Sequence, residues 1–150
     1  MFEGVIPEDL LGIIRILSAK GWYTLEEYNN GLKNLGFQSY ERGDKPCPVP
    51  TKIQVKKLKG KAVANWVHLR NWPLVMRRFE VDSEDVVLNL GLALHDIVER
   101  LCAQEFLPYE ISLLNEKIID YLNLRKNVRE EYPNFMTNPK PKHHFLRWKT

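Results

Sequence analysis

Five closely spaced lysines are the residues of this 150-residue chain that most clearly could bind a ligand, namely Lys52, Lys56, Lys57, Lys59 and Lys61. They belong to residues 45–78, a stretch with nine basic side chains and no acidic one. Cations in such a run could contact phosphate groups, which would give salt-dependent and largely sequence-independent affinity for nucleic acid. The alternative is internal neutralisation, because acidic residues outnumber basic ones by seven to four in residues 1–44 and by twelve to five in residues 79–131.

The two interpretations divide the basic residues into two groups. We expect the five lysines to face solvent or nucleic acid, because they lie on a loop and at the start of a helix. Lys140 and Lys142 near the C-terminus are added as further phosphate contacts. For Arg70, Arg77 and Arg78, which lie on a helical segment, we expect neutralisation by the acidic helices.

The histidines could in principle bind a metal ion, but their spacing argues against it. His143 and His144 are adjacent on an extended segment, so their side chains point to opposite faces. His68 and His95 lie on separate predicted helices, and no acidic pair accompanies them. Asp96 follows His95 directly, about 100° around the helix, so it is not placed to orient the imidazole. We therefore expect no metal site and no catalytic dyad.

The tryptophans and cysteines have structural as well as functional interpretations. Trp66, Trp72 and Trp148 are interleaved with basic residues and could stack nucleic-acid bases. Helical spacing with neighbouring valines favours a core role for Trp66. Cys47 and Cys102 lie far apart in the sequence, which favours two free thiols over a disulfide. The chain contains no phosphate-binding glycine loop and no recognisable nucleophile motif.

Composition and periodicity predict one mainly α-helical domain over residues 1–150. Apolar residues make up 44% of the chain, and no apolar run approaches the roughly 20 residues that span a membrane. Helical periodicity with start and stop signals predicts about five helices in a compact antiparallel bundle. They are expected at 7–20, from Thr24 to about 35, from Lys59 with a break at Pro73, from Ser83 to about 101, and at 108–132.

Three segments are expected to be extended rather than helical. Residues 37–57 form a long connection with several prolines, and a short strand could form around 53–55. Residues 1–6 and 139–150 look like stubs of strands whose neighbours are absent. The run of two Pro-Lys pairs followed by His143, His144, Phe145 and Leu146 is the clearest case. We therefore expect this chain to be a piece of a larger protein.

Four motifs, in this order, carry a resemblance to a known family: Phe2-Glu3-Gly4-Val5, Leu58-Lys59-Gly60-Lys61-Ala62 with Trp66, Leu69-Arg70-Asn71-Trp72-Pro73-Leu74, and Pro141-Lys142-His143-His144-Phe145-Leu146. Together they resemble the DDE transposases of animal DNA transposons, in particular the CACTA-like and Kyakuja-Dileera-Zisupton groups. The resemblance implies an RNase H-like core, in which two aspartates and a glutamate hold two divalent metals such as Mg²⁺. It places this chain in the helical region inserted between the second aspartate and the glutamate.

The same resemblance implies that the catalytic carboxylates lie outside this chain. The family continues with His-Tyr-Pro after the last motif, whereas this sequence continues with Arg147-Trp148-Lys149-Thr150. We therefore expect a non-catalytic helical fragment of a transposase that assists DNA binding in the nucleus. It would need no cofactor, membrane or small-molecule substrate, and could bind a second copy or the rest of the parent protein. The alternative is a helical protein-interaction or dimerisation module.

Overall fold

The computed structural model describes residues 2–37, 42–102 and 107–136, and these ranges form a helical domain without strands. The mainly α prediction is therefore confirmed. The helices are α1 (Phe2–Ala19), α2 (Leu25–Lys33), α3 (Ala62–Met76), α4 (Val86–Leu101) and α5 (Pro108–Glu131), with a short 3-10 helix, η1 (Arg42–Asp44).

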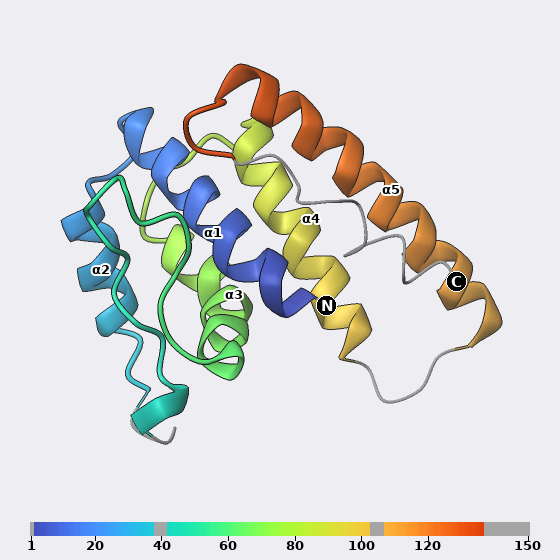
Figure 1. The fold of residues 1–150 in the computed structure, drawn as a ribbon, viewed down its shortest axis with the longest axis horizontal. Helices are drawn as coiled ribbons and strands as arrows, with labels where there is room; N and C mark the ends of the chain where they lie inside the picture. The colour runs from blue at the N-terminus through green and yellow to red at the C-terminus, as the bar shows by residue number, and fades with distance from the viewer. Residues whose placement is uncertain (1, 38–41, 103–106, 137–150) are drawn as a thin grey trace.

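The helices pack side by side around α1 and α4 (Figure 1). Helix α4 packs against α5 on one side and against α1 and α3 on the other. Helix α1 is nevertheless more completely buried. Its side chains from Leu10 to Leu17 are all buried, whereas Leu92 of α4 is 40% exposed. The middle of the first helix, residues 10–17, therefore lies at the centre of the core.

The second helix begins as its sequence predicts. The Thr24 hydroxyl accepts a hydrogen bond from the Glu27 backbone N–H, and the Glu27 carboxylate accepts one from the Thr24 N–H. This reciprocal pair satisfies two backbone donors at the helix start. The pattern is local in sequence, which is why it could be read without the fold.

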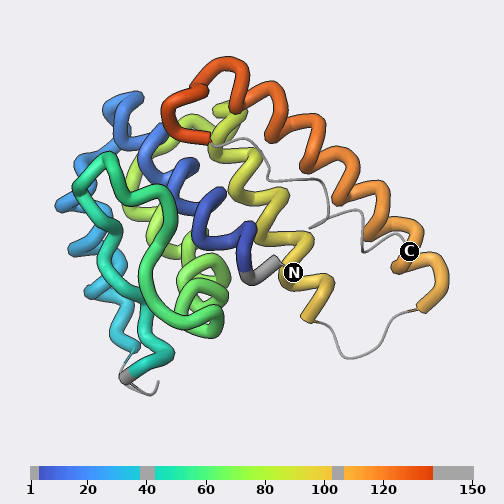
Figure 2. The backbone as a smooth tube through the Cα atoms, in the orientation of Figure 1, coloured from blue at the N-terminus to red at the C-terminus, as the bar shows by residue number. Residues whose placement is uncertain are grey.

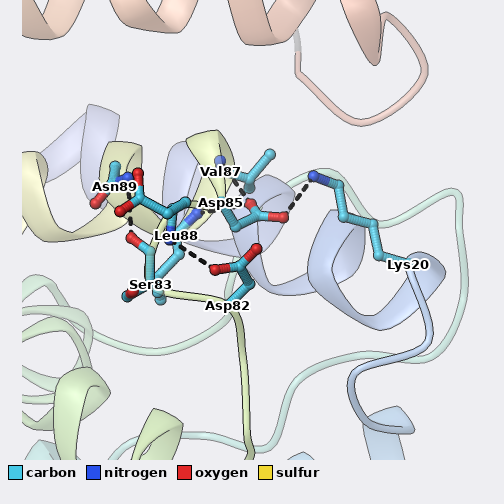
Figure 3. A network of polar contacts seen from close by, with 8 residues as sticks. Lys20, Asp82, Ser83, Asp85, Val87, Leu88 and Asn89 are labelled. Carbon is cyan, nitrogen blue, oxygen red and sulfur yellow. Dashed lines mark hydrogen bonds and ion pairs between the residues drawn. The ribbon is translucent and has the colours of Figure 1, made fainter.

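The fourth helix is capped by Asp85 and begins at Val86, so the predicted start at Ser83 is wrong (Figure 3). The Asp85 carboxylate accepts hydrogen bonds from the N–H groups of Val87 and Leu88. It also pairs with Lys20 at the end of α1, with 2.8 Å between Nζ and Oδ2. A charged acceptor with a cationic partner suits the positive end of the helix dipole better than a hydroxyl does.

The N-terminal segment is helical from Phe2, so the extended stub predicted over 1–6 is wrong for 2–6. Val5 and Ile6 are buried against the core, and this burial favours the extra turn. Pro7 removes one backbone donor inside the helix, but its own carbonyl accepts a hydrogen bond from Leu58. The second predicted stub, at 139–150, lies outside the described residues.

Two further predictions about extended or broken segments are also corrected. Helix α3 continues through Pro73 to Met76 and begins at Ala62 instead of Lys59. The described structure has no strand at 53–55, where the Val55 N–H donates to the Lys52 carbonyl and closes a turn. The turn carries the chain across α1.

Candidate nucleic-acid interface

The candidate site is the lysine segment, which we define as residues 45–61 between η1 and α3. In Figure 2 it runs along α1 and α2, on the opposite side of the molecule from α5. The five predicted lysines within it are all exposed. No carboxylate in the described part of the chain forms an ion pair with them. Lys140 and Lys142 lie outside that part.

Arg15 of α1 anchors the middle of the lysine segment through hydrogen bonds. Its side chain is only 8% exposed, and its guanidinium donates hydrogen bonds to three carbonyls of the segment. Nη1 lies 2.5 Å from the Val55 oxygen, while Nη2 lies 2.7 Å from that of Lys52 and 3.2 Å from that of Pro50. Burial lowers the pKa of Arg15, because the charged form loses hydration.

Asn29 of α2 anchors the first part of the lysine segment through hydrogen bonds. Its amide accepts from the Val49 N–H at 2.7 Å and donates to the Val49 carbonyl at 3.1 Å, as a neighbouring strand would. Toward the other end, the Leu58 N–H donates to the Pro7 carbonyl at 3.0 Å. The side chains of Val49 and Leu58 are both buried. The backbone between them is therefore held at both ends and in the middle, although it has no regular structure.

A groove of about 410 Å³ extends the positive surface from the lysine segment toward α2. Lys45, Pro46 and Pro48 line one side, and Leu32 and Lys33 of α2 are among the residues on the other. The lining contains no acidic residue. The groove therefore adds Lys33 and Lys45 to the basic residues of this region.

The predicted neutralisation of the α3 arginines holds for one of the three. Arg70 pairs with Glu99 of α4, with 3.4 Å between Nε and Oε1. Arg77 and Arg78 are exposed, and within the ranges described no carboxylate pairs with either of them. The prediction is therefore wrong for these two, which remain hydrated cations at the end of α3.

His95 and the neighbouring Asp96 of α4 have separate partners. His95 Nε2 lies 3.1 Å from the Arg70 carbonyl oxygen. The Asp96 carboxylate instead pairs with Lys117 of α5 and with Arg100. Residues 2–37, 42–102 and 107–136 contain no group of three potential metal ligands.

The tryptophans and cysteines also follow their structural interpretations. Trp72 is fully buried, and Trp66 is partly buried with the Arg70 guanidinium 5.2 Å from its ring. Trp72 thus belongs to the core and Trp66 packs against it, as predicted for Trp66, while Trp148 lies outside the described residues. Cys47 and Cys102 are free thiols, as expected.

No family model matches this chain, and comparisons with curated proteins and with solved structures found no match either. None of the helices described is both long and apolar enough to cross a membrane.

Sequence reasoning found the lysines of this site but missed the residues that hold them. Neither Arg15 nor Asn29 belongs to a motif, and their partners are 20 to 40 residues away along the chain. The one available signal was indirect. A long loop with buried residues must satisfy its backbone groups somewhere, and helix side chains are the natural donors.

Behind the site, a buried histidine links α2 to α3. His68 Nε2 lies 2.7 Å from the Tyr28 hydroxyl, and both side chains are almost fully buried. Burial lowers the pKa of His68 from 6.5 to about 3 and raises that of Tyr28 well above its usual value. Both groups are therefore neutral across the physiological range.

Lowering the pH from 7 to 5 should destabilise the protein through His68. The unfolded chain binds a proton on this histidine near pH 6.5, whereas the folded protein does not until about pH 3. The stability that neutral His68 contributes is thus fully present above pH 6.5 and is lost as the pH falls from 6.5 toward 3. About 2 kcal/mol of the free energy of unfolding should be lost by pH 5. Urea unfolding of the wild type and His68→Gln at both pH values measures this. An equal pH dependence in the two proteins would contradict the assignment.

Proposed function

We propose that this chain binds the phosphate backbone of duplex DNA through its lysine segment. The observation that carries the proposal is the exposure of five lysines, without ionic partners among the described residues, on a loop held against α1 and α2. Lysines on a held backbone lose less conformational freedom on binding than lysines on a free tail. The binding would depend on salt and little on sequence.

We further propose that the chain is the non-catalytic helical part of a transposase-like nuclear protein. The four sequence motifs, which follow one another in the order found in DDE transposases, support this part of the proposal. The domain would cover or position DNA near a catalytic core supplied by the parent protein. The divalent metals of that chemistry would belong to the core.

Replacing Lys56 and Lys57 with alanine should weaken DNA binding and reduce its salt dependence, because two phosphate contacts are lost. Each phosphate contact contributes about −0.9 to the slope of log Kobs against log salt. The double variant should therefore have a slope that is less negative by about 2. Fluorescence anisotropy of a short labelled duplex, titrated at several salt concentrations, measures both affinity and slope.

The matched control is Lys126→Ala with Arg129→Ala on α5, which removes the same charge from the opposite side of the molecule. Its slope should equal that of the wild type. Absence of binding at low salt, or equal slopes for the two double variants, would contradict the proposal. The first outcome would favour the interaction module instead, for which Leu107, Tyr109 and Ile111, all more than half exposed, offer an apolar contact surface.

A further inference from the structure

Two arginines are buried in the described part of the chain, and they have different kinds of partner. Arg125 of α5 faces the Asp9 carboxylate, which is the usual arrangement for a buried cation. Arg15 faces only backbone carbonyls, and within the described ranges no carboxylate pairs with it. Burying a cation without an anion is costly. Neutral Asn29 anchors Val49 nearby, so loop anchoring alone does not require a charge.

We infer that Arg15 is the positioning residue of the lysine segment, an inference that rests on the proposed function. The guanidinium fork joins the carbonyls of Pro50, Lys52 and Val55, and this fixes the turn that Lys52 begins and that Lys56 and Lys57 follow. Its charge also lies within hydrogen-bond distance of the Lys52 backbone and adds to the positive potential that a polyanion meets. Arg15 would act on DNA through the loop, without touching it.

A lysine at position 15 would keep the charge but lose the planar fork. A compact ammonium does not reproduce the fixed multidentate geometry of a guanidinium. The turn at 52–55 should then loosen, and binding would have to order the freed lysine backbone. We expect affinity for duplex DNA to fall about three- to tenfold. The salt slope should stay unchanged, because the number of phosphate contacts is the same.

The experiment compares the wild type with three variants. Arg15→Lys removes the fork, and Gln54→Gly loosens the same turn from its exposed side without touching the core. Tyr121→Phe is the stability control, since it removes a buried hydrogen bond between α5 and α1. Duplex affinity and salt slope are measured by anisotropy, and hydrogen exchange is followed at the Val55 and Leu58 amides.

Arg15→Lys and Gln54→Gly should both exchange faster at these amides and bind more weakly with an unchanged slope. Tyr121→Phe should melt lower and bind as the wild type does. Unchanged affinity in both loop variants despite faster exchange would overturn the inference, as would weakened binding in Tyr121→Phe. If the wild type binds no DNA, the proposed function fails. Exchange at Val55 would still show whether Arg15 orders the turn.

Discussion

Replacing Asp9 with asparagine should lower the free energy of unfolding by about 3–5 kcal/mol, since it breaks a buried ion pair from one side. Asp9 of α1 and Arg125 of α5 are almost fully buried. The guanidinium donates two hydrogen bonds to the carboxylate, from Nε at 2.8 Å and from Nη2 at 2.9 Å. The Tyr121 hydroxyl donates a third to the same carboxylate. The variant removes the negative charge that faces the buried guanidinium.

The electrostatics of the pair are consistent with a large effect. Burial alone would lower the pKa of Arg125, but Asp9, Tyr121 and Glu8 together raise it by more, so that the net shift is upward. Burial and the nearby Asp9 raise the pKa of Tyr121 well above its usual value, which keeps the hydroxyl as a donor. An amide in place of the carboxylate would leave these donors with a neutral acceptor only.

The matched control is Asp96→Asn, the same chemical change at a partly exposed ion pair with Lys117 and Arg100. Solvent screening limits the value of such pairs, so the expected loss is below about 1 kcal/mol. Urea unfolding at neutral pH gives both free energies. Equal losses in the two variants would show that the buried network contributes no more than a surface pair.

The sequence could predict the elements of this fold that depend on neighbouring residues. Thr24 and Glu27 lie three positions apart, and the start of α5 at Pro108 follows from a fixed backbone angle. The first turn of α1 could not be predicted in this way. Pro7 looks like a helix start, and only the tertiary burial of Val5 and Ile6 explains why the helix begins earlier.

The candidate site divides along the same line. Exposure of the lysines was expected from their place on a loop and at the start of a helix, which are local features of the sequence. The partners Arg15 and Asn29, like the pairing of Asp9 with Arg125 across 116 positions, depend on how helices meet in space. Arg77 and Arg78 make the same point, because the charge pattern predicted a neutralisation, whereas no described carboxylate pairs with either of them. Charge pattern predicts where cations are, but not what holds them.

The contact between Trp72 of α3 and Gly91 of α4 leads to a second large prediction. Trp72 is fully buried, and a Cβ added to Gly91 would lie 2.3 Å from its ring. The two helices therefore meet where one has no side chain and the other has the largest. Trp72→Ala should cost about 3–5 kcal/mol, as expected for removal of a buried indole.

The effect of Gly91→Ala on the free energy of unfolding should change sign between the wild type and the Trp72→Ala variant. In the wild type it should destabilise by about 1–3 kcal/mol or more, because the rigid indole has to move. In Trp72→Ala that space is empty, and the same change should stabilise by up to about 1 kcal/mol through helix propensity. The coupling energy follows from a double-mutant cycle by urea unfolding.

Gly31→Ala on α2 is the control for the propensity gain. Gly31 is also buried in a helix, but the nearest atoms to an added Cβ, on Arg78 and Val75, are 3.5 Å away, an ordinary contact distance. This variant should be neutral or stabilising in the wild type. If Gly91→Ala behaved like Gly31→Ala in the wild type, the close α3–α4 contact at Trp72 would be disproved. Gly91 would then affect stability only through its low helix propensity. The geometry indicates instead that the absence of a side chain at Gly91 leaves room for the buried indole.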